Sequence, residues 1–472
     1  MDSKVYYMDA RSKSPQTSLV AKMMAVFKAA GFEKIIKQGD MVAIKLHCGE
    51  WNNTAYLRPV YARTLVDLIK SIGGRPFVCD TITLPYSLHP GRSTGLDFMV
   101  TAERNGYNSA TLGCPFIFAD GFMGTDDYHV DLPEGFILKE AYIAEAIAAA
   151  DVLITLSHFK GHGTGVIGGA IKNLGIGAQS RRGKFSVHMG GHPEYGFGAC
   201  AFHPEKFKGK KYDKNWQELT ECCPFDLIHI VGDSIEWENK KCTNCMACAG
   251  PMFSRGLIDL FAENLEATDA AIADGCLAAV KAVGKGKVAF INLAIDIANL
   301  CDCTPFADVS ILPDLGVFAS YDPVAIDKAC LDKAQATLGI QGSVAEEKHV
   351  LECGKHRFEV CSAGWPGLSE EIQLNVGEIN GLGKRKYKLI PVVEEQLKDI
   401  AFPPDPRPTG VRFRQLYQKL QPFPYDRHGG NGFLRAEKVE LKNVNAYYDP
   451  SQQFLENRVT KKKKHISEDV KK

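Results

Sequence analysis

Three cysteines recur at intervals of three residues in the stretch Cys242-Thr-Asn-Cys245-Met-Ala-Cys248, and a Cys223-Pro224 pair precedes them. Thiols at this spacing lie along one tight turn, where their thiolates can face a single metal centre. Such a segment folds around its metal, because a metal site rarely preforms in the unfolded chain. This motif therefore constrains the fold more than any other feature of the sequence.

The spacing matches the bacterial ferredoxin run C-x2-C-x2-C-x3-C-P, whose fourth cysteine binds the other cluster of a two-cluster protein. The place of a fourth cysteine after Cys248 is occupied by Met252. At the three ligand positions of a first cluster, counted back from Cys223, stand Asp213, Trp216 and Leu219. One cluster has thus lost its thiolates, while the other keeps its full set. We predict a ferredoxin-like unit with one 4Fe-4S cluster, bound by Cys223, Cys242, Cys245 and Cys248.

Alternatives remain at this motif. Zinc binds cysteine runs as well, although structural zinc sites usually pair one C-x2-C unit with a second unit at a distance. Thiols that bind no metal are the remaining interpretation. Cys222 is adjacent to Cys223 and competes with it as the fourth ligand.

The composition is that of an ordinary globular protein. At 472 residues the chain has room for two or three domains, or for one large domain with insertions. Its formal net charge of zero gives no indication of binding to nucleic acid. The 15 cysteines indicate metal ligands and free thiols in a reducing compartment. We find neither the apolar region of a signal peptide nor an apolar run of roughly 20 residues, so we expect a cytoplasmic protein with no membrane span.

Helix and strand patterns alternate over residues 1–180, which predicts an α/β domain. We expect helices at 17–31, 59–72 and 139–150, and strands at 40–47, 75–80 and 151–157. Residues 181–256 break this pattern and are interpreted as a small α+β insertion that contains the ferredoxin-like unit. The strands read as continuous apolar runs, which is typical of a mostly parallel sheet with helices on both faces.

The α/β pattern resumes over residues 257–391. Helices are expected there at 268–283 and 323–338, and strands at 287–295, 309–312 and 316–320. Residues 392–472 are rich in proline and polar residues and carry a run of four lysines at 461–464, near their end. We interpret them as a docking arm with a basic tail, which is either solvated charge or a contact for an acidic redox partner protein.

Polar side chains follow several predicted strands, where open α/β sheets place their ligand crevice. Asp322, which follows the strand at 316–320, belongs to this set unless it only caps a helix. The remaining members are His47 and Glu50, then Asp80 and Thr81, then His158, Lys160 and His162. We predict one shared cleft, with catalytic roles for His47, His158, Lys160 and His162, and ligand-binding roles for Glu50 and Asp80.

Two motifs follow the strand at 151–157. Gly168, Gly169, Lys172 and Asn173 would bring backbone N–H groups and a cation to a small anionic ligand. A close-packed turn without a ligand is the alternative. Residues 163–168 also match G-x-G-x-x-G, but the acidic residue expected roughly 20 positions later is missing, so a dinucleotide site is only weakly indicated.

The C-x-C pair Cys301-Asp302-Cys303 follows the predicted strand at 287–295. Two thiols at this spacing can share one metal, whereas their close Cα positions disfavour a mutual disulfide. We expect either a second metal site or a reactive thiol pair here, and a cysteine-lined cleft wall is the other interpretation.

The chain resembles the uncharacterised iron–sulfur centre protein family, also called the domain of unknown function 362 family. The residues that carry this resemblance are 42–50, 156–162, 168–177, 301–303, 312–328 and 383–390, so it extends over residues 1 to about 391. The resemblance implies an α/β domain with a two-cluster ferredoxin insert, from which this chain departs by its lost first cluster. It implies no reaction, so any catalytic claim rests on the site itself.

Three functions fit these features. The first is electron transfer or redox catalysis, as in an iron–sulfur oxidoreductase, on a small ligand in the cleft. The second is an accessory protein that matures or delivers a metal or an iron–sulfur cluster. In the third, a structural cluster stabilises a protein that binds a small anion.

Overall fold

The computed structural model describes residues 2–84, 91–188, 192–259, 262–364 and 367–393, and only single residues after these. The chain divides into two compact units, 1–400 and 401–472, and all elements named below belong to the first. The basic run 461–464 and nearly all of the predicted arm 392–472 lie outside the described residues.

An eight-stranded sheet forms the centre of the first unit, in the order β16-β1-β15-β14-β7-β2-β3-β4. Five of its pairings are parallel, while β15 runs antiparallel to both of its neighbours. The strands are β1 (Ser3–Met8), β2 (Met41–Lys45), β3 (Arg75–Asp80), β4 (Phe116–Phe118), β7 (Val152–His158), β14 (Val288–Ala294), β15 (Gly316–Ser320) and β16 (Tyr387–Pro391). The predicted α/β class and the mostly parallel sheet are therefore confirmed.

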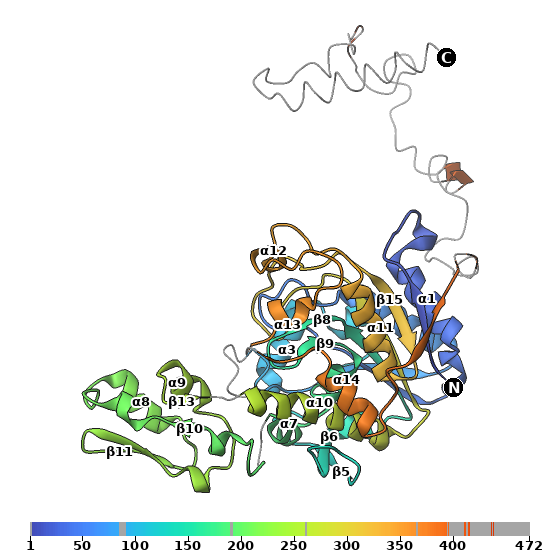
Figure 1. The fold of residues 1–472 in the computed structure, drawn as a ribbon. Helices are drawn as coiled ribbons and strands as arrows, with labels where there is room; N and C mark the ends of the chain where they lie inside the picture. Colours follow the sequence, from blue (N-terminus) through green and yellow to red (C-terminus); the bar gives the residue numbers. More distant parts are fainter. Residues whose placement is uncertain are drawn as a thin grey trace. The chain divides into compact units, whose positions relative to one another are not determined.

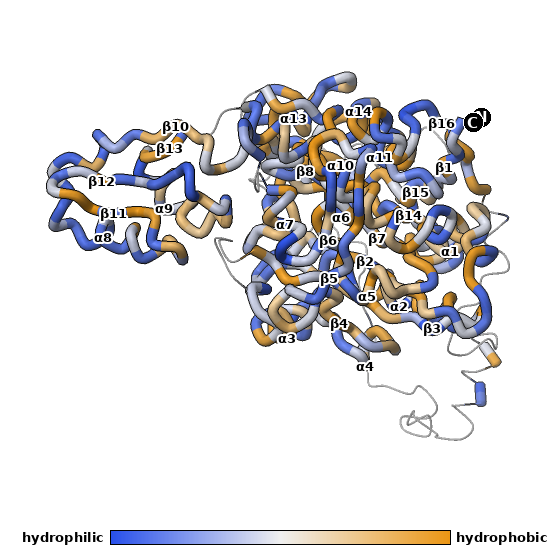
Figure 2. The backbone as a smooth tube through the Cα atoms, turned by 90° about the horizontal axis from the view of Figure 1, so that it is seen from below, coloured by the Kyte–Doolittle hydropathy of each residue, from blue (hydrophilic) through white to orange (hydrophobic). Residues whose placement is uncertain are grey.

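Helices cover both faces of this sheet, as Figures 1 and 2 show. One layer contains α1 (Leu19–Ala30) and α2 (Pro59–Ser71), and the other contains α6 (Ala170–Gly175), α10 (Ala262–Val283), α11 (Pro323–Gln335) and α14 (Ile372–Ile379). Every residue of β7, β14 and β15 is buried, as expected for strands that are covered on both sides. The large hydrophobic core joins these strands to the overlying helices.

Two glycines let α6 and α10 pack closely. A Cβ atom on Gly175 would lie 2.1 Å from the backbone oxygen of Ile272, and one on Gly275 would lie 2.5 Å from the backbone oxygen of Gly175. Side chains at these positions would push the helices apart. Because α6 carries Lys172 and Asn173, this contact also fixes the depth of the site described below.

Shorter elements complete the α/β part. They are α3 (Gly95–Arg104), α4 (Ser109–Leu112), β5 (Asp127–Asp131), β6 (Glu140–Ala144), α5 (Glu145–Ala148), β8 (Lys160–His162), β9 (Val166–Gly168), α7 (Arg181–Val187), α12 (Val344–Glu347) and α13 (Arg357–Cys361). Among the described residues, no helix combines the length and the apolar character needed to cross a membrane.

The segment interpreted as an insertion builds a hydrophobic core of its own from residues between Phe197 and Ile258. It contains β10 (Ala201–Phe202), α8 (Lys214–Glu221), β11 (Ile228–Val231), β12 (Ser234–Trp237), α9 (Ala249–Ser254) and β13 (Ile258–Asp259). In Figure 2, a hydrophobic stretch runs through β11 between hydrophilic ones. Strands β11 and β12 form an antiparallel hairpin. The short strands β10 and β13 also pair antiparallel, and together with α8 and α9 these pairs give the segment an α+β character.

Two predicted elements are wrong. The helix expected at 139–150 is divided between strand β6, which pairs antiparallel with β5, and the short helix α5 that follows it. Its alanines favour a helix, but burial of Ala141 and Ile143 on one face of the hairpin overrides this preference. The strand expected at 309–312 is absent from the described structure, where Ile311 makes single backbone hydrogen bonds to Ile297 and Ile340.

Candidate functional site

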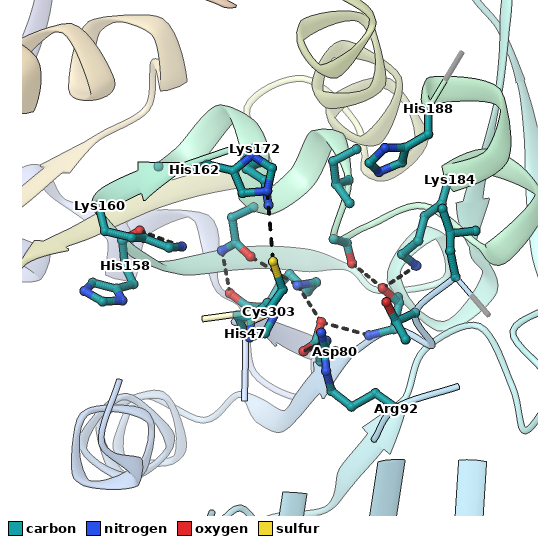
Figure 3. A pocket seen from close by; sticks show the side chains of 18 residues that line it. His47, Asp80, Arg92, His158, Lys160, His162, Lys172, Lys184, His188 and Cys303 are labelled. Atoms are coloured by element: carbon teal, nitrogen blue, oxygen red, sulfur yellow. Dashed lines mark hydrogen bonds and ion pairs between the residues drawn. The ribbon is translucent and has the colours of Figure 1, made fainter. Parts of the chain in front are cut away.

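A cavity of about 200 Å³ opens at the carboxyl ends of β2, β3 and β7 (Figure 3). Open α/β sheets bind their ligands at this edge, so the predicted crevice lies where the topology favours it. The polar side chains that line the cavity are Lys45, His47, Asp80, Thr81, Thr83, Arg92, His158, Lys160, His162, Lys172, Asn173, Lys184, His188 and Cys303. Five of them are lysine or arginine, and only Asp80 is acidic.

A buried ion network joins the ends of β2 and β3. The Lys45 ammonium lies 3.0 Å from a carboxylate oxygen of Asp80, and both side chains are at most 3% exposed. The Arg92 guanidinium lies 3.0 Å from Glu50 and 3.8 Å from Asp80. Burial alone would raise the pKa of Asp80, but Lys45, His47 and Arg92 outweigh it and hold this pKa well below its usual range. Asp80 is therefore ionised and links two cations.

Lys45 is further fixed by Asn173 of α6, whose amide oxygen accepts a hydrogen bond from the ammonium at 3.1 Å. The Asn173 amide group donates to the backbone oxygen of Lys45 at 3.1 Å and to the Ser157 hydroxyl at 3.0 Å. A Cβ atom on Gly177 would lie 2.5 Å from the Lys45 nitrogen, so this glycine leaves room for the ammonium.

A second buried pair lies beside Thr81. The Lys184 ammonium donates to the Thr81 hydroxyl at 2.8 Å and to the backbone oxygen of Gln179 at 2.6 Å, and lies 3.8 Å from Asp120. Burial lowers the pKa of Lys184, against the attraction of Asp120. Since Lys184 belongs to α7, part of the segment 181–256 that the sequence assigned to the insertion lines this cavity.

His158 is held through both ring nitrogens. Nδ1 lies 2.8 Å from a carboxylate oxygen of Asp302, and Nε2 lies 2.7 Å from the backbone oxygen of Ile295. Lys160 lies 3.6 Å from the other oxygen of Asp302. Burial would raise the pKa of Asp302, but His158 and Lys160 lower it to about 2. His158 has no ring nitrogen left for a ligand, so its geometry indicates an anchor for Asp302 in place of the predicted catalytic role.

His47 and His162 keep one ring nitrogen for the cavity. Each accepts a backbone N–H at Nδ1, from Gly49 at 3.0 Å and from Gly165 at 2.8 Å. Burial, and then the charge of Arg92, lowers the pKa of His47 to about 3. Burial, and then Lys172, lowers the pKa of His162 to about 4. Both rings are therefore neutral at pH 7, with the proton on Nε2.

Several other predicted residues support the site through packing and hydrogen bonds, and Gly169 among them also lines the cavity. Glu50 holds Arg92 and is fully buried. At the start of α6, Asp327 accepts hydrogen bonds from the N–H groups of Ala170 and Ile171, at 2.8 and 2.9 Å. A Cβ on Gly169 would collide with Asp327, and one on Gly168 would press on Lys160. These two glycines thus form a close-packed turn, and the anion position at this helix start is already taken by Asp327.

The placement of Asp322 in the cleft is wrong, and the weakly indicated dinucleotide motif does not have the structure that such a site needs. Asp322 caps α11 by accepting the N–H groups of Val324 and Ala325. It lies away from the cleft because β15 is antiparallel and ends at the opposite edge of the sheet. Residues 163–168 form the turn and second strand of the β8–β9 hairpin, whereas a dinucleotide fingerprint leads directly from a strand into a helix.

Cys301 and Cys303 lie beside His162. The three side chains form a group whose ligand atoms all lie within 4.8 Å of one another. The Cys301 sulfur accepts the backbone N–H of Cys303 at 3.3 Å and faces the Lys172 ammonium at 3.7 Å. The Cys303 sulfur lies 4.0 Å from Nε2 of His162, and Figure 3 shows this contact inside the cavity.

The four predicted cluster ligands share one small region of the insertion. Burial raises the pKa of Cys248 to about 12, and the neighbouring thiols of Cys242, Cys223 and Cys245 add to this rise. The Cys242 sulfur accepts the backbone N–H of Asn244, and the Cys223 sulfur accepts that of Leu227, both at 3.4 Å. Backbone N–H groups directed at sulfur are typical of iron–sulfur sites.

The backbone around these thiols contains two residues with a positive φ. Asn244 and Met246, which alternate with the cysteines, both have a φ of 58°. A Cβ on Gly198 would lie 3.2 Å from that of Cys242, and the Gly198 N–H donates to the Asn244 side chain at 2.6 Å. The Cys222 sulfur instead donates to the backbone oxygen of Glu218 at 3.4 Å. The Cys222 side chain is thus turned back to α8, whereas Cys223 contributes to the rise in the pKa values of Cys242 and Cys248.

Sequence reasoning missed three cations of the cavity and one thiol. Lys45 was detectable, because a lysine inside a buried apolar strand demands a partner. Arg92 and Lys184 gave no signal, since they come from a loop and a helix outside the strand ends. Cys200 is also buried near Cys242, and burial raises its pKa to about 11.

The chain belongs to the family described as "Domain of unknown function (DUF362)", which matches residues 42–332. No curated protein matches the chain. Among solved structures, it is similar to the lactate racemase apoprotein from Thermoanaerobacterium thermosaccharolyticum, at 12% identity and a TM-score of 0.30. The similarity covers 62% of this chain and 51% of that one, so the chain spans about half the length of that protein.

The buried Lys45–Asp80 pair predicts a large effect of one substitution. Asp80→Asn leaves Lys45 and Arg92 without their shared charge and is expected to lower the free energy of unfolding by about 3–5 kcal/mol. Asp67→Asn removes the exposed pair with Arg63 and is expected to cost less than about 1 kcal/mol. Urea unfolding of both variants measures the difference, and equal losses would contradict the structural role of Asp80.

Neutral buried histidines predict a loss of stability in acid. Burial lowers the pKa values of His47 and His188 to about 3 and that of His162 to about 4. Unfolding exposes these imidazole rings to water, where their pKa returns to about 6.5 and they take up a proton more readily. Their contribution is complete above pH 6.5 and is lost as the pH falls, at roughly 1–2 kcal/mol per ring between pH 7 and 5. Urea unfolding at both pH values measures this loss. His47→Asn should reduce it by one ring's share, and an unchanged slope would contradict the assignment.

Proposed function

We propose that this member of the DUF362 family is an iron–sulfur protein with one 4Fe-4S cluster in its insertion and a small anionic ligand in its α/β cavity. The proposed activity is electron transfer to or from that ligand, as in an iron–sulfur oxidoreductase. All 15 cysteines are free, which supports a reducing, cytoplasmic setting.

The arrangement around the four thiols carries the cluster proposal. Cys223, Cys242, Cys245 and Cys248 come from two separate turns, and the first three all add to the rise in the pKa of Cys248. Burial and mutual repulsion raise the pKa of Cys242 and Cys248, so these thiols need a cationic centre to become thiolates. Two sulfurs already accept backbone N–H groups, which suits an anionic cluster better than a protonated thiol pair.

The residues of the insertion would perform distinct tasks. The four cysteines hold the cluster, which supplies one-electron transfer when bound. The N–H groups of Leu227 and Asn244 stabilise charge on the sulfurs, a factor that sets the reduction potential of such sites. Gly198 gives the Cys242 turn the space that it needs. A redox partner protein would exchange electrons with this unit.

The arrangement of charge in the cavity carries the ligand proposal. Lys45, Arg92, Lys160 and Lys184 line the cavity. Three carboxylates that pair with these cations, those of Glu50, Asp120 and Asp302, lie behind the lining. Among the described residues, Lys172 has no carboxylate partner, and it lines the same cavity. An anion that enters therefore meets ammonium and guanidinium groups first.

The iron content of the protein tests the cluster proposal. Purified without oxygen, the protein is expected to contain about four irons per chain, because one cluster has four ligands. Cys223→Ser should abolish or convert the cluster, as judged by iron analysis and by EPR of the reduced protein. Cys222→Ser is the matched control and should retain the full iron content.

Three outcomes would contradict this assignment. An iron content near eight would require a second cluster, zinc in place of iron would exclude the cluster, and the reverse behaviour of the two serine variants would reassign the fourth ligand. A cluster that cannot be reduced reversibly in a redox titration would leave only a structural role.

Inorganic phosphate is a suitable probe for the cavity. It is expected to raise the unfolding temperature of the protein beyond the effect of sodium chloride at equal ionic strength, since it binds only the folded state. Lys172→Met should weaken phosphate binding about tenfold or more, because a charged hydrogen bond is lost. Lys348→Met removes an exposed lysine and should bind phosphate like the unaltered protein. Equal behaviour of the two variants, or no stabilisation at all, would contradict the anion site.

A further inference from the structure

Cys301 and Cys303 form a group that the proposed electron transfer does not use. Their loop is held rigidly: the Glu50 N–H donates to the backbone oxygen of Asp302 at 2.8 Å, and Thr304 donates twice to that of Cys301. Asp302, between the cysteines, is anchored by His158. The two sulfurs are therefore presented to the cavity from a fixed backbone.

The donor set of His162, Cys301 and Cys303 resembles a metal site, but two observations argue against one. A histidine that binds a metal through one nitrogen usually donates a proton from the other. The Nδ1 atom of His162 instead accepts the N–H of Gly165, which leaves the proton on Nε2, directed toward the sulfurs. The Lys172 ammonium, 3.7 Å from Cys301, also repels a cation.

The same surroundings favour a thiolate. The hydrogen bond with Cys303 lowers the pKa of the Cys301 thiol most, burial opposes this, and Lys172, Lys160 and His162 add to the lowering, so the pKa lies well below its usual range. The bond to Cys301 and burial raise the pKa of Cys303. These opposite shifts favour the negative charge on Cys301 and the proton on Cys303.

We propose that Cys301 and Cys303 form a reactive thiolate–thiol pair that adds to the carbonyl carbon of a small anionic ligand, with Cys303 as the attacking sulfur. Cys303 lines the cavity, whereas Cys301 is 2% exposed and lies behind it. The cations of the cavity bind the ligand's carboxylate or phosphate. A thiol at this position requires an electrophile, which an aldehyde or ketone carbon provides.

The addition balances without any further reactant. A lone pair of the Cys303 sulfur forms the S–C bond, and the π pair of the carbonyl group moves to its oxygen. The proton of Cys303 passes to the Cys301 thiolate. The new oxyanion forms in a cavity that contains the ammonium groups of Lys160 and Lys172, which stabilise it.

This inference rests on the anion site of the proposed function and is independent of the cluster. Iodoacetate and iodoacetamide are suitable probes, because they differ in charge and alkylate a cysteine once its proton has left, here from Cys303 to the Cys301 thiolate. In the cluster-containing protein, without oxygen, Cys303 is expected to react with both reagents at least about tenfold faster than the exposed Cys353. Its preference for iodoacetate over iodoacetamide should exceed that of Cys353 about tenfold, because the cations attract the anionic reagent. Peptide mass spectrometry locates and times each modification.

Two variants of Lys172 test the cause of the fast reaction of Cys303. Lys172→Met should slow alkylation of Cys303 about tenfold and reduce its preference for iodoacetate, while Cys353 and the iron content stay unchanged. Lys172→Arg keeps the charge, so Cys303 should keep its preference for iodoacetate. This variant keeps the inference testable if the methionine variant fails to fold. Glyoxylate, an anionic aldehyde, should protect Cys303 better than acetate, which has the charge without the electrophilic carbon.

Several results would overturn the inference. The first is alkylation of Cys303 no faster than that of Cys353, and the second is modification of Cys301 in place of Cys303. The third is equal protection of Cys303 by glyoxylate and acetate. The last is a stoichiometric metal that the Cys223→Ser variant retains and that a further Cys303→Ser substitution removes. If the anion site alone fails, fast reaction with iodoacetamide persists without a preference for iodoacetate. If the thiol pair alone fails, phosphate still stabilises the protein while both reagents react slowly.

Discussion

The buried ion pair between Lys45 and Asp80 is the interaction on which the rest of the cavity depends. A lysine that is 1% exposed is tolerated only when a charge compensates it, and this charge comes from the end of the neighbouring strand. The parallel register of β2 and β3 pairs Lys45 with Cys79 and so brings Asp80 within reach. A slip of one strand by one residue would turn its side chain to the other face of the sheet and separate the pair. The register of β2 and β3 therefore determines both the burial of the cations and the form of the site.

Much of this arrangement follows from the sequence, and the exceptions have physical causes. The edge where β2, β3 and β7 end was predictable, because buried apolar strands followed by His47, Asp80 and Lys160 mark it. Arg92 and Lys184 were not, since loop and helix positions have no periodicity that points to a distant pocket. Asp322 was misassigned because the antiparallel direction of β15 is a tertiary property. The strand β6 escaped detection for the same reason, as its pairing with β5 overrides its helix-favouring alanines.

In the insertion, the sequence predicted the set of thiols, whereas the directions of their side chains depend on the fold. Its cysteine spacing alone predicted one set of four thiols, and the fold brings these thiols into one region with its own hydrophobic core. Spacing could not choose between Cys222 and Cys223, because adjacent residues differ only in the direction of their side chains. That direction comes from the end of α8, where Cys222 turns back to Glu218. The close approach of Gly198 likewise depends on contacts between segments that are distant in sequence.

We propose that the chain uses cysteine in two ways, as metal ligands in the insertion and as a reactive pair in the cavity. The thiols of the insertion lie in one region, and the raised pKa values of Cys242 and Cys248 favour a metal centre. Cys301 faces ammonium groups and an N–H donor, which stabilise a thiolate without a metal. An anomalous-scattering map at the iron edge, from crystals grown without oxygen, tests this distinction most directly. We predict one iron site, enclosed by Cys223, Cys242, Cys245 and Cys248, and no metal beside His162, Cys301 and Cys303. Iron in the cavity, or an insertion without iron, would contradict the account.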